Sequence, residues 1–326
     1  MRELAFYLFS LCLLASCEDG KSGSTTLPPM TGGLNEVVIV LDEHLWQGQS
    51  GDSLRMTLGA EVPGIPWQEP LFDLAQIPKK AFTRIFKTHR NLLVFEKGAK
   101  TEVGFQKDLY SKGQLVALIK YRSQEDLPLL LHQYGAVIAH RFQEVEKERQ
   151  LAELPLQKGL DSVFKKHGIS LNIPKDFHLS LDTNMFSWLE YSPENKEIIQ
   201  GLFIYEITND FTFTTWGLLA ERDRMLQQYV PGLTEGSYMS TERLISPWVK
   251  HTESMGCPAL EVKGVWRMEN AFMGGPFIAH YVLDTVNKKV IAIEGFLFNP
   301  GEDKRDHMQR LQLVLESAKR LPTEIK

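Results

Sequence analysis

The sequence predicts an α+β protein with two lobes, each a mainly antiparallel sheet flanked by helices. Two observations indicate this class: hydrophobic runs typical of strands follow one another with short turns, and segments with apolar residues at helical spacing lie between them. The 326 residues allow one or two domains, each with a substantial core. Pro155 and Gly159 interrupt the pattern, so we expect lobes at 35–155 and 156–326.

In the first half, the run 36–41 is β-branched and predicts a buried strand. Asp52 and Ser53 favour a helix that starts at Leu54, and the Pro- and Gly-spaced stretch that follows predicts a loop. In the later segments, the spacing of the apolar residues predicts, in order, a helix at 79–90, strands at 91–96, 103–108 and 114–121, and a long helix at about 125–153.

The second half predicts mainly strands, with two helices. A helix is expected at about 216–229, where Pro231 and Gly232 end it, and a final amphipathic helix at 303–321, with Asp303 as its N-cap. The turn at 284–289 predicts a hairpin. The expected strands lie at 169–173, 177–181, 185–191, 199–207, 259–268, 277–283 and 290–298.

Composition excludes several classes of protein. With 43% hydrophobic residues, 10% aromatics and three cysteines, the chain is neither disordered nor a disulfide-stapled mini-protein. Nucleic-acid-binding proteins usually carry a basic excess, whereas 36 Lys+Arg against 41 Asp+Glu give a net charge of −5. We therefore expect no nucleic-acid partner.

The N-terminal residues predict a location outside the cytoplasm. The apolar run 4–15 is too short to span a bilayer and is typical of a signal peptide. Leu14-Ala15-Ser16-Cys17 resembles the bacterial lipobox, so we expect a signal peptide at 1–16 and a lipid on Cys17. The alternatives are an ordinary secretory peptide with an incidental cysteine and a buried N-terminal strand.

Residues 17–34 are polar and rich in small residues, which predicts a flexible tether between the lipid and the folded part. Glu18 and Asp19 resemble the surface-export signal of Bacteroidota lipoproteins. The expected partners are the membrane, reached through the lipid anchor, and the signal peptidase and lipoprotein-sorting machinery. The expected location is the cell envelope, at the outer membrane, on its periplasmic face or at the cell surface.

The sequence contains none of the common catalytic or phosphate-binding motifs, and we expect no metal and no cofactor. His140 and Glu144 lie one helical turn apart, but such a pair is common on solvated helices. Cys257 is expected to be an unreactive buried or loop thiol, and the alternative is a catalytic nucleophile.

Two groups of residues predict binding surfaces. The first is a basic helix face, which would meet anionic headgroups, phosphorylated glycans or an acidic partner; its alternative is a solvated face. The second combines aromatic and charged residues, as ligand clefts do; its alternative is core and rim packing. The first group contains Lys80, Arg84, Lys87 and Arg90, and the second contains Glu235, Tyr238, Glu242, Trp266 and Arg267.

Several spaced motifs resemble a known family. They are Arg222-Asp223-Arg224, the stretches 229–232 and 234–242, Gly264-Val265-Trp266 and the stretch 273–277. Together they are similar to the domain of unknown function 4837 family of Bacteroidota lipoproteins. In the first half the likeness continues through Trp46, Gly51, Glu69-Pro70, Phe86 and His89-Arg90-Asn91, which implies coverage of nearly the whole mature chain.

This family has no assigned activity, so the resemblance implies a location and no mechanism. We expect a lipid-anchored envelope protein that binds or scaffolds an envelope protein or glycan and performs no chemistry. The alternative is a periplasmic hydrolase that uses carboxylates or a histidine in an unrecognised arrangement.

Overall fold

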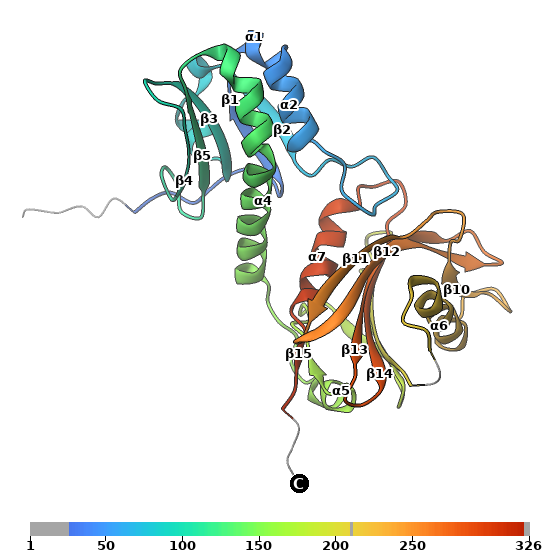
Figure 1. Cartoon of the computed structure of the whole chain (residues 1–326). Helices are drawn as coiled ribbons and strands as arrows, with labels where there is room; N and C mark the ends of the chain where they lie inside the picture. Colours follow the sequence, from blue (N-terminus) through green and yellow to red (C-terminus); the bar gives the residue numbers. More distant parts are fainter. Residues whose placement is uncertain (1–25, 209–210, 323–326) are drawn as a thin grey trace, which may run out of the picture.

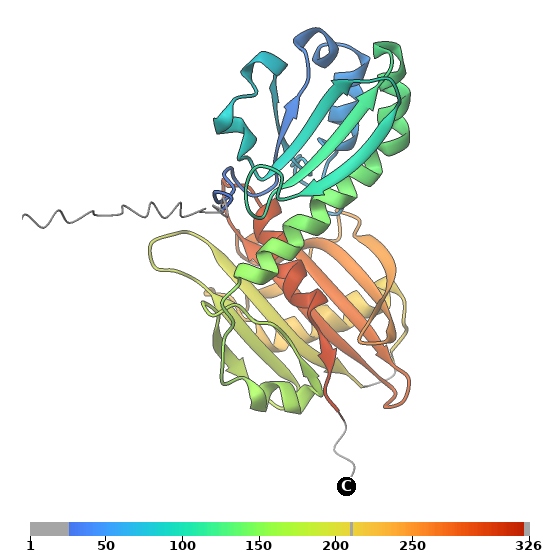
Figure 2. The same cartoon turned by 90° about the vertical axis from the view of Figure 1, so that its left-hand side faces the viewer.

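The computed structural model describes residues 26–208 and 211–322, which form two lobes (Figure 1). The expected signal peptide and Cys17 lie outside the described residues. The long helix α4 (Leu127–Glu153) leaves the N-terminal lobe and reaches the C-terminal lobe beside α7 (Arg305–Glu316) (Figure 2). Among the described helices, none is long and apolar enough to span a bilayer.

The N-terminal lobe contains a five-stranded sheet with the order β2-β1-β3-β5-β4. β1 pairs in parallel with β2 and β3, β3 pairs in parallel with β5, and only the β4–β5 pair is antiparallel. The expectation of a mainly antiparallel sheet is therefore wrong for this lobe. Its strands are β1 (Glu36–Val40), β2 (Asp73–Ile77), β3 (Asn91–Lys97), β4 (Glu102–Lys107) and β5 (Leu115–Tyr121).

The β3–β5 pair is parallel because β4 lies beyond β5, at the edge of the sheet. The parallel pairing around β1 involves β2, which the residue pattern did not indicate. Along β2 the residues alternate between exposed and half-buried until Ile77, as in an edge strand, so the segment lacks the apolar run of a central strand. The chain reaches β2 from β1 through α1 (Glu43–Trp46) and α2 (Gln49–Thr57). A connection of this length, with helices, allows the second strand to run parallel to the first.

Helices cover one face of this sheet and an irregular segment covers the other. α1, α2 and α4 pack their apolar residues on the first face. On the second face, Phe82 and Phe86 cover Val38 and Val40. The helix expected at 79–90 is instead a 3₁₀ turn, η1 (Lys79–Ala81), and one α-helical turn, α3 (Arg84–Lys87), because Thr83 is extended between them.

The C-terminal lobe is an eight-stranded antiparallel sheet that curls around α6 (Thr215–Tyr229), with α7 on its outer face (Figure 1). The α+β class and, for this lobe, the antiparallel sheet are confirmed. The strand order is β10-β12-β13-β14-β9-β8-β7, and β11 also pairs with β12. The strands are β7 (His178–Asp182), β8 (Phe186–Tyr191), β9 (Ile199–Ile207), β10 (Tyr238–Thr241), β11 (Trp248–Ser254), β12 (Cys257–Glu269), β13 (Gly274–Asp284) and β14 (Lys289–Phe298).

Some short elements of this lobe were not expected. These are α5 (Asp161–His167), β10 and β11, whereas β6 (Ile169–Ser170) lies at the start of an expected strand and pairs with β15 (Lys319–Arg320). They carry few large apolar residues in a regular period, which explains why the pattern does not indicate them. In the other lobe, Asp52 and Ser53 lie within α2 and do not cap it, since α2 begins after Gly48.

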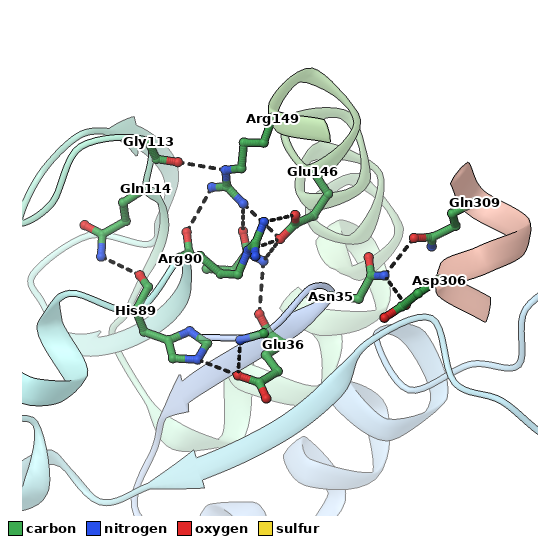
Figure 3. A network of polar contacts seen from close by, with 12 residues as sticks. Asn35, Glu36, His89, Arg90, Gly113, Gln114, Glu146, Arg149, Asp306 and Gln309 are labelled. Carbon is green, nitrogen blue, oxygen red and sulfur yellow. Dashed lines mark hydrogen bonds and ion pairs between the residues drawn. The ribbon is translucent and has the colours of Figure 1, made fainter. Parts of the chain in front are cut away.

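The two lobes are joined at the N-terminus of α7. Glu69, from the loop before β2, accepts hydrogen bonds from the backbone N–H groups of Lys304 and Arg305. Asn35, which directly precedes β1, donates to Asp306 (2.8 Å) and Gln309 (2.7 Å), both on α7 (Figure 3). Asp303, the expected N-cap, makes no side-chain cap, because a carboxylate of the other lobe fills that role.

Candidate functional site

Three of the predicted residues, Tyr238, Glu242 and Arg267, line one hollow of about 660 Å³ on the surface of the C-terminal lobe. We call it the α6–β10 hollow, since α6 forms one wall and β10 with the end of β12 forms the other. The residues that line it are Ala220, Asp223, Arg224, Gln227, Tyr238, Ser240, Thr241, Glu242, Arg243, Leu244, Arg267 and Glu269.

Beneath the hollow, α6 is anchored by a buried ion pair. Arg222 makes two hydrogen bonds to Glu294 on β14, at 2.8 and 2.6 Å, and neither residue has exposed surface. Its guanidinium also lies 4.0 Å from the centre of the Phe277 ring. Although burial alone lowers the pKa of Arg222, the Glu294 carboxylate raises it above its ordinary value, so the arginine stays charged.

The next residue of α6 fixes the open edge of β10. Asp223 accepts hydrogen bonds from the backbone N–H of Thr241 (2.8 Å) and from its hydroxyl (2.6 Å). Arg222 donates to the same hydroxyl at 3.0 Å, and Arg243 donates to Asp223 at 2.7 Å. The hollow therefore stands on a connected polar network, which holds its side chains in defined positions.

The rim carries side chains of both charges. Arg267 lies between Glu269, at 2.9 Å, and Glu242, at 3.7 Å. Arg224 pairs with Glu221, one helical turn earlier, at 2.9 Å. Three arginines and three carboxylates line the hollow, so it does not favour a ligand of either sign.

Aromatic rings complete the surface. Tyr238 is half-buried at the hollow, and Trp216, at the start of α6, is 49% exposed with the guanidinium of Arg243 6.0 Å from its ring. Aromatic faces beside fixed donors and acceptors are typical of ligand sites. Within the described residues, histidine, cysteine and carboxylate side chains nowhere form a group of three or more that could hold a metal.

Two residues of the second predicted group lie elsewhere. Trp266 is buried in the core and donates from Nε1 to the carbonyl of Leu297 at 3.1 Å. It adjoins Arg267 in sequence, but neighbours on a strand point to opposite faces of the sheet. Glu235 is exposed in the loop before β10, outside the hollow.

The first predicted group is divided. Arg90 lies inside the N-terminal lobe, where it makes hydrogen bonds of 2.8 and 2.6 Å to Glu146 on α4, so it is not free to bind a ligand (Figure 3). Lys80 and Arg84 are exposed, and Lys87 is half-buried, with its ammonium near the rings of Phe82 and Tyr110.

The structure assembles a chain of polar groups around buried His167 and Ser187 that the sequence did not reveal. His167 Nε2 lies 2.9 Å from Ser187 Oγ, and His167 Nδ1 lies 3.8 Å from Glu206. Ser187 also donates to Asp182 at 2.7 Å. Ser187 has no exposed surface, so a substrate does not reach its hydroxyl in this conformation. The arrangement anchors α5 to the sheet.

A second histidine borders a cleft of about 660 Å³ between the lobes. His280 Nε2 lies 3.3 Å from Glu261 on the neighbouring strand, and Lys263 Nζ lies 3.6 Å from the same carboxylate. Burial lowers the pKa of Lys263. Burial would raise the pKa of Glu261, but the hydrogen bond from His280 and the charge of Lys263 lower it. In the sequence, these residues are indicated only by the alternation of side chains along β12 and β13, which places Glu261 and Lys263 on the same face of the sheet.

Two family models match the chain, one in each lobe. The model described as Domain of unknown function (DUF4837) matches residues 157–317. A second model, Domain of unknown function (DUF8532), matches residues 30–154. The expected resemblance to domain of unknown function 4837 is thus confirmed for the C-terminal lobe. Its expected extension over the N-terminal lobe is corrected, because that lobe matches a different model.

The remaining comparisons identify only distant likenesses. No curated protein matches the chain. Among solved structures, LpqN of Mycobacterium tuberculosis, described as involved in cell envelope biogenesis, is 13% identical, with a TM-score of 0.28, over 47% of this chain and 83% of that one. Cyanobacterial PsbP from Synechocystis sp. PCC 6803 is 14% identical, with a TM-score of 0.31, over 48% and 88%.

Proposed function

We propose that this chain, whose residues 157–317 match the DUF4837 model, is a lipid-anchored cell-envelope protein that binds an envelope glycan in the α6–β10 hollow. The anchor is the lipid expected on Cys17, at the outer membrane. The observation that carries the binding role is the convergence of Arg267, Glu242 and Tyr238 on one hollow. No chemical step is needed for this role.

The chemistry of the hollow fits a ligand rich in hydroxyl groups. A sugar hydroxyl both donates and accepts hydrogen bonds, whereas arginine only donates and a carboxylate only accepts. Arg267 beside Glu242 and Glu269, and Arg243 beside Asp223, present both functions at adjacent positions. The balance of charges favours an uncharged glycan over a polyanion.

The ring of Tyr238 adds a flat apolar surface to this set of polar groups. The C–H face of a sugar ring can pack on such a surface while its hydroxyls reach the charged groups around it. A phenol also presents a polar tip, so the side chain suits a site that is partly wet. An aromatic ring among charged groups of both signs does not suit a fully apolar ligand. It does not suit a nucleotide either, because the phosphates of a nucleotide require an excess of positive charge.

A glycan array tests the proposal. The full chain, purified in detergent, is incubated with neutral and uronic-acid-containing bacterial envelope oligosaccharides. We expect a neutral oligosaccharide to be retained, and Glu242→Gln and Arg267→Ala to weaken binding by about tenfold or more, because each removes hydrogen bonds to a charged group. Arg122→Ala, an exposed arginine of the other lobe, is the matched control.

If the wild type retains no oligosaccharide, or if both variants bind as well as the wild type, the glycan proposal fails. The anchor has a separate test in cells. A palmitate analogue should label the wild type and leave Cys17→Ala unlabelled, and a labelled variant would contradict the anchor.

The second candidate function is hydrolysis in the cleft between the lobes. His280 Nε2 lies 3.3 Å from Glu261, as in a base held by a carboxylate, and both residues line the cleft beside Lys263. Because His280 Nδ1 is buried, catalysis would require this part of the cleft to open. Turnover of a chromogenic ester or peptide by the wild type, lost in His280→Gln, would favour this function. Glycan binding without any turnover would favour the first.

A further inference from the structure

The first described residues enter the fold at one defined place in the N-terminal lobe. Thr31 donates its backbone N–H to Thr88 (2.9 Å) and accepts from the N–H of Arg90 (2.8 Å). The carbonyl of Pro28 accepts from the N–H of Lys112 at 2.8 Å. The last part of the expected tether is therefore bound to the lobe, beside the segment that contains α3.

The length of chain before this point limits its distance from the proposed anchor. Pro29 lies twelve positions after Cys17, and a fully extended chain of that length spans at most about 43 Å. If Cys17 carries a lipid, the segment beside Thr31 stays within that distance of the bilayer surface. A linker of this length holds the linked surface at a millimolar effective concentration near the membrane.

The surface next to this point is basic, with one large apolar side chain. We call it the tether-side basic surface: Lys80, Arg84, Ile85, Lys87 and Lys112. Ile85 is 78% exposed in α3, between Arg84 and Lys87. Within the described part of the chain, the four cations of this surface form no ion pair with a carboxylate, whereas Arg90, three residues after Lys87, is paired with Glu146. The charges of Lys80, Arg84 and Lys112 are therefore available to a ligand outside the protein, whereas the ammonium of half-buried Lys87 lies near the rings of Phe82 and Tyr110.

Figure 2 shows α3 and the first described residues on the same side of the N-terminal lobe. The chain as a whole has a net charge of −5, so an anionic surface repels it on average. A local group of cations on such a chain favours one orientation. An exposed isoleucine among cations suits the headgroup region of a bilayer, where the apolar side chain leaves water and the cations meet phosphates.

We propose that the tether-side basic surface lies on an anionic phospholipid bilayer, with Ile85 at headgroup level. This inference rests on the proposed anchor at Cys17. It also gives the protein an orientation. α6 and β10 lie on the opposite side of the molecule from the first described residues (Figure 1), so the α6–β10 hollow faces away from the membrane.

Hydrogen exchange on vesicles tests the orientation. The full lipidated chain is reconstituted on vesicles of phosphatidylcholine alone or mixed with phosphatidylglycerol. We expect amide exchange in 79–89 to slow by about fivefold or more on the mixed vesicles only, since each basic residue near an anionic surface strengthens binding by about fivefold. Added salt should reverse the effect, because it screens exposed charges.

The charge-reversal variant Lys80→Glu/Arg84→Glu should lose this protection. Lys97→Glu/Lys100→Glu makes the same charge change at exposed positions of the same lobe and should keep it. Equal exchange on both vesicle types, or equal protection in the two variants, would overturn the proposal. A full chain that fails to float with phosphatidylcholine vesicles would instead contradict the anchor, so the two failures are distinguishable.

Discussion

The carboxylate of Glu69 accepts a hydrogen bond from the backbone N–H of Arg305 at 2.6 Å, across the boundary between the two lobes. It also accepts from the N–H of Lys304 and therefore caps α7, whose free N–H groups favour a negative charge. The Arg305 guanidinium returns to the other lobe and donates to Asp73 at 2.8 Å. Burial alone would lower the pKa of Arg305, but Asp73 and Asp306 raise it.

We expect Glu69→Ala to lower the free energy of unfolding by about 1–2 kcal/mol, because it removes a helix cap. It should also increase proteolysis of the loop that contains Glu69, since that loop loses its attachment to α7. Chemical denaturation and limited proteolysis measure the two effects. Glu302→Ala is the control, an exposed acid two residues before Lys304. An equal effect of both substitutions would show that Glu69 has no special role.

The buried Arg222–Glu294 pair gives a second prediction. Arg222→Met leaves the Glu294 carboxylate without its partner in the core, and we expect a loss of about 3–5 kcal/mol. The double variant Arg222→Met/Glu294→Leu should recover much of this loss, because no buried charge remains. Urea unfolding of Arg222→Met, Glu294→Leu and the double variant gives the three free energies of a double-mutant cycle. A single variant within about 1 kcal/mol of wild type would contradict the role of this pair.

The fold class was predictable because the long elements carry strong periods. α4 and α6 place apolar residues at helical spacing, and β9, β12, β13 and β14 are apolar runs. The direction of strand pairing was not predictable in the N-terminal lobe, because it depends on the order of the strands in the sheet. The weakly apolar strand β2 lies at one edge, and β4 lies beyond β5 at the other. The cap of α7 was also hidden, since Glu69 lies far away in sequence.

The candidate site was predictable only in part. Tyr238, Glu242 and Arg267 lie in one hollow because β10 pairs with the end of β12, a register that no local pattern reveals. Trp266, for which core packing was the alternative, lies in the core, and a strand that is buried on both faces gives no alternation from which its side could be read. Arg90 looked like part of a basic face because its partner Glu146 is distant in sequence.

A third prediction concerns Gly275, at the start of β13. A Cβ atom there would lie 2.0 Å from the carbonyl oxygen of Leu297, which accepts the hydrogen bond from Trp266. We expect Gly275→Ala to lower the free energy of unfolding by about 1–3 kcal/mol through overpacking. The wavelength of the tryptophan emission should also change as the hydrogen bond of Trp266 is disturbed. Gly104→Ala, where a Cβ meets nothing within 4 Å, is the matched control and should be close to neutral. Similar Tm values for the two variants would contradict this packing.

The last prediction concerns acid. The pKa of Glu261 lies below its ordinary value of 4.5 because the hydrogen bond from His280 and the charge of Lys263 outweigh its burial. A carboxylate whose pKa is lower in the folded state stabilises the fold above pH 4.5, and this contribution is lost as the pH falls through the folded-state value.

Glu261→Gln should therefore destabilise the protein at pH 7, by about 1–3 kcal/mol for hydrogen bonds to a charged group. Well below pH 4.5 the wild-type side chain is itself protonated, so the difference between the two proteins should shrink toward zero. Thermal unfolding of both proteins across this pH range measures the effect. Glu253→Gln, on the neighbouring strand β11 and exposed, should follow the wild type at every pH. A difference between wild type and Glu261→Gln that stays constant with pH would mean that the contacts of Glu261 do not depend on its charge.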